Sequence, residues 1–155
     1  MSSFQIIVGS MLGGTEYVAE SCEEQLLAQD HQVQLHLDPN FSTILNATFD
    51  EKTNNPDTWL ICTSTHGAGE LPDNIQPFFE DLENCEQDLS SVSFMIIAVG
   101  DSNYDTFCKA GETINKKLIS RGCKEITPVM TIDMKQDVDP EDLAIQWLIE
   151  KSDLL

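Results

Sequence analysis

Three apolar runs in this sequence each end in a turn that combines glycine with hydroxyl or aromatic residues. Each run is a short block rich in aromatic and branched aliphatic side chains, which is typical of a buried strand. The turns that follow the runs are Gly9–Glu16, Thr63–Glu70 and Gly100–Cys108. In an open α/β sheet, ligands bind outside the carboxyl ends of the strands, so turns in this position line one crevice. The pattern predicts an α/β fold with a ligand crevice at one edge of its sheet.

The whole chain alternates strand-like and helix-like segments. The predicted strands are 4–8, 31–37, 59–62, 94–99 and 126–132, with an edge or a bulge indicated by Pro128. The predicted helices are about 14–29, one within 38–57, one after Asp73 or Asn74, one ending near Arg121, and one from Asp139 that buries Leu143, Trp147 and Leu148. Strands joined by helices form a parallel sheet with right-handed crossovers. We expect a three-layer sandwich with a five-stranded parallel sheet of order 2-1-3-4-5 and helices on both faces, because this order places the three turns side by side.

The charge of the chain limits its partners. The sequence has 155 residues, enough for one domain over residues 1–155, and its 27 acidic and 8 basic residues give a formal net charge of -19. Nucleic acids and anionic membranes need a basic face, so the charge argues against both. It favours basic protein partners, although a generic acidic solvated surface has the same composition. We expect a monomer.

The cysteines indicate the compartment. There are 5 of them, no two at C-x-x-C spacing, and the 3 histidines are scattered, so neither a disulfide framework nor a metal site is expected. Reduced thiols are typical of cytosolic proteins. The N-terminal apolar run, 6–8, is too short for a signal peptide or a membrane span. These features predict a cytoplasmic protein.

The first turn suits a phosphate dianion. A helix N-terminus offers unsatisfied N–H groups and the positive end of the helix dipole. Gly13 and Gly14 allow close approach of the backbone, and the hydroxyls of Ser10 and Thr15 can donate further hydrogen bonds. The turn lacks the lysine of a P-loop and the G-x-G-x-x-G of a dinucleotide site. A plain strand-to-helix turn is the alternative.

The other two turns suit a flat aromatic ring. Gly67 and Gly69 allow peptides to reach a ring edge, and His66 either lies against one ring face or faces solvent. Tyr104 is a platform for stacking, worth roughly 1–3 kcal/mol per ring, although a lone tyrosine would be ordinary surface. We expect Phe107 and Cys108 to pack beneath their loop. A phosphate joined to a flat ring indicates flavin mononucleotide (FMN).

These turns resemble those of a known family. Gly9-Ser10-x-x-Gly13-x-Thr15-Glu16 is similar to the flavodoxin phosphate loop, while 64–74 and 100–108 resemble loops of the FMN domains of diflavin reductases. With its length, the chain looks similar to the short, free-standing MioC-type flavodoxins, and the resemblance covers nearly all of it. The resemblance implies a flavodoxin-like fold and FMN as cofactor. In the family, the peptide at the position of Gly67 turns toward flavin N5 on one-electron reduction, and an aromatic residue usually stands where this chain has His66.

The turns and the resemblance together assign the following residues to the cofactor: Ser10, Met11, Leu12, Gly13, Gly14, Thr15, Ser64, Thr65, His66, Gly67, Gly69, Gly100, Asp101, Asn103, Tyr104, Phe107 and Cys108. No catalytic residue is expected.

The function implied is that of a low-potential one-electron carrier with no substrate turnover of its own. It would receive electrons from an NADPH-dependent flavodoxin/ferredoxin reductase and pass them to an acceptor with a basic surface. The carboxylates of Glu70, Asp73, Asp101 and Asp105 would ring the exposed flavin edge. The alternatives are a flavin-dependent NAD(P)H or quinone reductase and a flavin-free interaction module. A response-regulator receiver is disfavoured because no acidic cluster follows the first strand.

Overall fold

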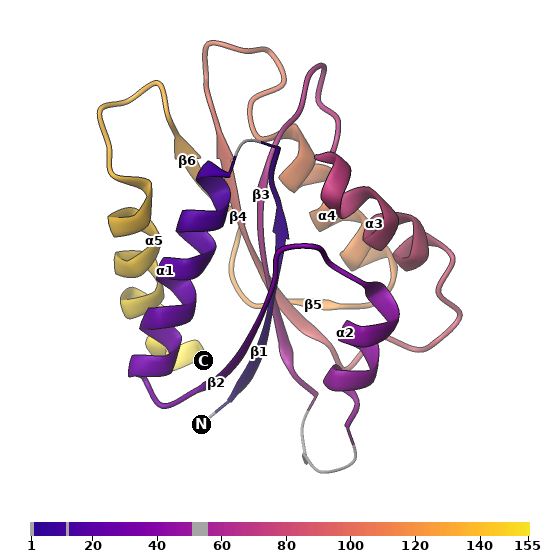
Figure 1. Ribbon diagram of the computed structural model, residues 1–155. Coiled ribbons are helices and arrows are strands. Elements are labelled where there is room, and N and C mark those ends of the chain that lie inside the picture. The colour runs from indigo at the N-terminus through magenta and orange to yellow at the C-terminus, as the bar shows by residue number, and fades with distance from the viewer. Residues whose placement is uncertain (1, 12, 51–55) are drawn as a thin grey trace.

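A parallel sheet between two layers of helices forms the protein (Figure 1). The computed structural model describes residues 2–11, 13–50 and 56–155. The strands are β1 (Ser3–Gly9), β2 (Gln32–His36), β3 (Thr58–Ser64), β4 (Ser93–Gly100), β5 (Lys124–Glu125) and β6 (Met130–Asp133). They are arranged in the order β2-β1-β3-β4-β5, and β6 also pairs with β4. The predicted sandwich and its strand order are confirmed.

Two groups of helices cover the sheet, one on each face (Figure 1). They are α1 (Gly14–Ala28) and α5 (Pro140–Glu150) on one face, and α2 (Phe41–Thr48), α3 (Gln76–Glu83) and α4 (Lys109–Ser120) on the other. Two short 3₁₀ turns are η1 (Asp73–Ile75) and η2 (Ser152–Leu154). Because side chains alternate along a strand, Ile6 packs in the core under α1 and α5 while Ile7 packs in the core of the opposite face. Within the described residues, no helix combines the length and apolar character needed to cross a membrane.

The fifth strand position differs from the prediction of one strand over 126–132. β5 and β6 both pair with β4. The amide of Ile126 still donates to the carbonyl of Phe94 over 2.9 Å, but residues 127–129 leave the ladder. Pro128 lies in this interval and has no N–H to donate to a neighbouring strand. β6 coincides with the second half of the predicted strand, and β5 lies just before its first residue.

The last helix buries a narrower stripe than predicted. Ala144, Trp147 and Leu148 are buried, in agreement with the three- and four-residue spacing of a helix face. Leu143 is 38% exposed, so its predicted burial is wrong. It precedes the buried stripe by one position and therefore turns about 100° away from the core.

The carboxyl ends of the central strands lie level with one another. Gly9 is opposite Thr63 across β1 and β3, Ser64 is opposite Val99 across β3 and β4, and Gly100 is opposite Asp133 across β4 and β6. The turns that leave these strands therefore meet at one edge, at the top of Figure 1.

A buried polar chain lies nearer the opposite end of the sheet. Gln5 donates from Nε2 to Oδ2 of Asp57 at 2.7 Å, and its Oε1 is 2.6 Å from Nε2 of His36. Burial raises the pKa of Asp57, against the opposing effect of the Gln5 hydrogen bond. The folded state therefore holds this proton at pH values where the unfolded chain has released it. Stability falls as the pH rises from the ordinary aspartate pKa through the raised one, and the loss persists at neutral pH.

Asp57→Asn is accordingly expected to increase the free energy of unfolding at pH 7 and to make its pH dependence between pH 4 and 7 less steep. The asparagine Oδ1 still accepts from Gln5 but carries no charge to desolvate. Urea unfolding at both pH values measures the effect. Asp88→Asn is the matched control. Hydrogen bonds from Ser90 lower the pKa of Asp88, so this substitution is expected to decrease the free energy of unfolding at pH 7. A less stable Asp57→Asn protein at pH 7 would contradict the argument.

Candidate functional site

Two adjoining cavities open at the carboxyl edge of the sheet. The larger is about 480 Å³ and the smaller about 300 Å³. Both are lined by Ser64, Thr65, Val99 and Met134, so they form one continuous trough with shared walls. All three predicted turns contribute to this trough.

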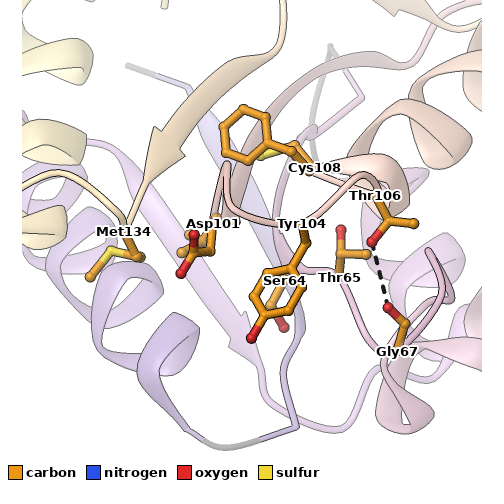
Figure 2. Close-up of a pocket in the computed structure, with 11 residues that line it drawn as sticks. Ser64, Thr65, Gly67, Asp101, Tyr104, Thr106, Cys108 and Met134 are labelled. Carbon is orange, nitrogen blue, oxygen red and sulfur yellow. Dashed lines mark hydrogen bonds between the residues drawn. The ribbon is translucent and has the colours of Figure 1, made fainter.

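The larger cavity lies between the second and third turns (Figure 2). Met134 borders it on one side, and Gly67 and Thr106 border it on the other (Figure 2). Tyr104 projects over it with 68% of its surface exposed. An exposed aromatic face above a cavity of this size is suited to stacking on a planar ring.

The third turn is held in shape by hydrogen bonds and close contacts among its own residues. Asp101 accepts from the Asn103 amide at Oδ1 over 2.8 Å, and its carbonyl accepts from the Tyr104 amide over 3.1 Å. Gly100 is needed where the turn folds back, since a Cβ there would lie 3.0 Å from Sγ of Cys108. Cys108 itself has a left-handed backbone with φ 54°. These bonds fix the position from which Tyr104 projects.

The segment after β6 forms a wall that sequence reasoning missed. Met134 donates from its amide to the carbonyl of Gly100 over 2.7 Å, which places its side chain between the two cavities. Oδ1 of Asp133 accepts from the amides of Ser102 and Lys135 at 2.9 Å and 3.0 Å. Hydrogen bonds from Ser102, supported by Lys135, lower the pKa of Asp133, so a charged carboxylate holds the third turn.

The second turn closes on itself and is joined to the third. His66 and Glu70 exchange two backbone hydrogen bonds of 2.8 Å, and Gly67 and Gly69 between them have φ values of 53° and 103°. Glycine adopts such values at less cost than residues with a side chain. The hydroxyl of Thr106 donates to the Gly67 carbonyl over 3.5 Å, drawn as the dashed line in Figure 2.

The first turn leads into a helix that begins without a side-chain cap. The N-cap residue of α1 is Gly13, which has φ 86° and has no side chain that could cap the first N–H groups of the helix. The first N–H groups of a helix lack α-helical partners, and Gly14 and Thr15 at the start of α1 line the smaller cavity. A Cβ on Gly13 or Gly14 would meet nothing within 4 Å, so the space in front of the helix is open.

The trough fits FMN in both shape and chemistry. The uncapped N-terminus of α1 and the hydroxyls of Ser10 and Thr15 match a phosphate, and the larger cavity beneath Tyr104 matches a ring. Placing the phosphate in the smaller cavity puts the ring in the larger one, because the shared wall at Ser64 and Thr65 lies between them.

Most of the predicted site residues line the trough. They are Ser10, Met11, Gly14, Thr15, Ser64, Thr65, His66, Gly67, Gly100, Asp101, Tyr104, Phe107 and Cys108. Gly13, Gly69 and Asn103 are not among the lining residues, and Leu12 lies outside the described residues. The lining residues that sequence reasoning missed are Val18, Val99, Thr106, Met134 and Pro140.

Cys108 lines the larger cavity, but its thiol is held as a neutral group. Its Sγ donates to the Ala98 carbonyl over 3.4 Å, and burial, with the nearby charges of Asp133 and Glu112, raises its pKa to about 11. At pH 8 roughly one molecule in a thousand then carries the reactive thiolate.

Alkylation at pH 8 is therefore expected to modify Cys85, which is partly exposed, well before Cys108. A time course with iodoacetamide, followed by peptide mass spectrometry, measures the order. Cys123 is an internal comparison, because its pKa is also raised to about 11 by burial. Labelling of Cys108 as fast as that of Cys85 would contradict the assignment.

Comparisons with known proteins agree with this geometry. Residues 6–147 match the family model described as flavodoxin. The chain is 46% identical over 143 residues to a "Protein MioC homolog" of Pasteurella multocida, covering 92% of this chain and 91% of that protein. It is 31% identical over 155 residues to "Flavodoxin YqcA" of Escherichia coli, covering 100% and 99%. Among solved structures, a cysteine-to-alanine mutant of a flavodoxin from Pseudomonas aeruginosa superposes with a TM-score of 0.88 at 29% identity, covering 99% of this chain and 98% of that one.

Proposed function

This chain belongs to the flavodoxin family of FMN-binding electron carriers, and we propose that it carries electrons one at a time at low potential, without turning over a substrate of its own. The observation that supports the proposal is the trough itself. An uncapped helix start and an exposed tyrosine border two cavities with shared walls. FMN supplies the redox chemistry when bound, and the protein supplies binding, orientation and electrostatics.

Different residues of the trough would bind different parts of the cofactor. Ser10, Thr15 and the start of α1 would hold the phosphate, while Tyr104 would stack on the ring and Gly67 would border its edge. The net charge of -19 disfavours adding a further negative charge to the ring. We therefore propose a low potential.

The carboxylates around the trough suggest the kind of partner surface that would dock there. Glu70, Asp73 and Asp105 are exposed, and Asp101 lines the cavity. We propose that this acidic rim docks an NADPH-dependent flavodoxin/ferredoxin reductase and then an acceptor, each with a basic face. Such rim charges raise association rates by roughly 10- to 1,000-fold at low salt. Unchanged reduction rates between low and high salt would refute the docking model.

The proposed setting is the cytoplasm, with the protein acting as a monomer. All five cysteines are free, which agrees with a reducing compartment. The net charge of -19 opposes self-association.

The test of one-electron carriage is a stepwise anaerobic reduction of the protein with FMN bound, followed by its visible spectrum. Two resolved one-electron potentials would support the carrier. A single two-electron step, together with steady NAD(P)H consumption by the pure protein, would favour a flavin-dependent reductase instead. Absence of FMN binding would refute both and leave an interaction module.

Tyr104→Ala is expected to weaken FMN binding by roughly 5- to 150-fold, which corresponds to the loss of about 1–3 kcal/mol of stacking. Because Tyr104 is 68% exposed, the substitution should leave the free energy of unfolding of the FMN-free protein nearly unchanged. Tyr17→Ala is the matched control, since Tyr17 is 62% exposed on α1 and lines neither cavity. Quenching of FMN fluorescence gives both dissociation constants, and equal values for the two variants would refute the stacking role.

A further inference from the structure

The side chain of Asn74, in η1, ties together three distant segments of the chain. Its Oδ1 accepts from the amide of Ser10 over 2.9 Å. Its Nδ2 donates to the carbonyl of Val8 over 2.8 Å and to that of Leu37 over 3.0 Å. Both amide protons and the amide oxygen are therefore in use. This one side chain fixes the end of β1, the residue after β2, and Ser10 in the first turn (Gly9–Glu16), which we call the phosphate turn.

The short 3₁₀ turn that carries Asn74 packs closely against the phosphate turn. A Cβ at Gly9 would lie 3.0 Å from Cγ2 of the buried Ile75, so the missing side chain at Gly9 lets η1 approach. The amide of Asp73 also lies 3.3 Å from Sδ of Met11 and donates to it. Two successive residues of η1 thus contact two successive residues of the phosphate turn.

These contacts determine which groups of the turn remain for a phosphate. The amide of Ser10 already donates to Asn74, so it is not a phosphate donor. The hydroxyl oxygen of Ser10 accepts from the amide of Gly13 over 3.0 Å, and the hydroxyl proton is therefore the group left to donate. The bond to Gly13 also fixes this hydroxyl relative to the start of α1. A chain of two hydrogen bonds thus runs from Asn74 through Ser10 to the helix N-terminus.

We propose that Asn74 is a positioning residue for the phosphate group of FMN, and that it sets how strongly the protein prefers FMN over riboflavin. It lines neither cavity, and it acts by holding Ser10 in place before the ligand arrives. A turn that is ordered in advance loses less conformational freedom on binding, which strengthens binding. Riboflavin has the same ring without the phosphate, so only FMN benefits from the ordered turn. The inference rests on FMN binding and is independent of the potentials.

The test compares the dissociation constants of FMN and riboflavin for wild type, Asn74→Ala and Asn74→Asp, by quenching of flavin fluorescence. Asn74→Ala is expected to weaken the binding of FMN roughly 10- to 100-fold through the three lost hydrogen bonds. The binding of riboflavin should weaken by no more than about twofold. Asn74→Asp keeps an acceptor for the Ser10 amide but loses both N–H donors and adds a negative charge behind the phosphate. It should weaken the binding of FMN at least as much as Asn74→Ala does, again with little effect on the binding of riboflavin.

Asn84→Ala is the matched control, because the Asn84 side chain donates to the Glu80 carbonyl at the end of α3, away from the trough, and both dissociation constants should stay at their wild-type values. Unfolded protein in a preparation removes sites for both ligands equally and leaves the ratio of the two constants unchanged. If Asn74→Ala does not fold, the same comparison is made with the nearly isosteric Asn74→Asp, for which the ratio of the two constants should change at least as much. Equal weakening of FMN and riboflavin, or no weakening of either, would overturn the proposal. A wild-type protein that bound neither flavin would instead refute the cofactor assignment.

Discussion

Replacing Gly9 with valine is expected to reduce the free energy of unfolding by about 3 kcal/mol or more, at the upper end of overpacking penalties, and to abolish tight FMN binding. Gly9 is buried at the end of β1, where a Cβ would lie 2.5 Å from Oγ1 of Thr63 and 3.0 Å from Cγ2 of Ile75. Neither neighbour can withdraw easily, because Thr63 belongs to β3 and Ile75 is fully buried. To make room, η1 would have to leave the phosphate turn.

Urea unfolding of the FMN-free protein and an FMN titration measure the two effects of Gly9→Val. Gly14→Ala is the control for folding, because a Cβ on Gly14 meets nothing within 4 Å and should change stability by no more than about 0.5 kcal/mol. A Gly9→Val protein with wild-type stability would show that the close approach of η1 is not needed for folding.

Trp59→Ala is expected to cost about 3–5 kcal/mol of stability, a large part of the roughly 5–15 kcal/mol of a typical domain. Trp59 is fully buried, with its ring centroid 6.3 Å from that of Phe41 and 5.9 Å from that of Phe78. Its Nε1 donates to Oγ1 of Thr48 over 2.8 Å. The substitution removes one of the contacts that join α2 and α3 to the sheet and leaves a cavity beside Phe41 and Phe78.

Trp59→Phe separates the ring from the hydrogen bond. It should cost less than Trp59→Ala, because it keeps an aromatic ring between Phe41 and Phe78. In both variants the Thr48 hydroxyl still donates to the Ile44 carbonyl. Urea unfolding followed by circular dichroism gives both values. Trp59 is near the start of β3, away from the carboxyl edge, so FMN affinity per folded molecule should stay at the wild-type value in both variants. Equal costs for the two variants would contradict the packing role of the ring.

The sequence predicts the sheet order well because the three ligand turns must be neighbours. It predicts the fifth strand less well. The alternating residues of 126–132 look like one strand, and only the pairing with β4 shows that the ladder is broken near Pro128. The pattern also predicts burial of Leu143 wrongly. An apolar residue near a helix start can fit the helical spacing without facing the core.

The site could be predicted where its residues directly follow a strand, and not where they arrive through tertiary contacts. Met134 lies in a segment without glycine or aromatic residues, and it reaches the cavities through a hydrogen bond to Gly100. Asn74 looks in sequence like an ordinary helix cap. Its actual partner, Ser10, is 64 residues away along the chain, a separation that local patterns do not report.

The interruption between β5 and β6 also has a consequence for molecules at high concentration. An uninterrupted outer strand exposes a row of backbone donors and acceptors to which another chain can add, and repeated addition leads to fibrous aggregates. Here the outermost segments beside β4 are two and four residues long, separated by a proline-containing kink. An incoming strand would find no continuous row of partners along this margin. The kink thus disfavours polymerisation along this margin of the sheet, opposite the margin that β2 forms.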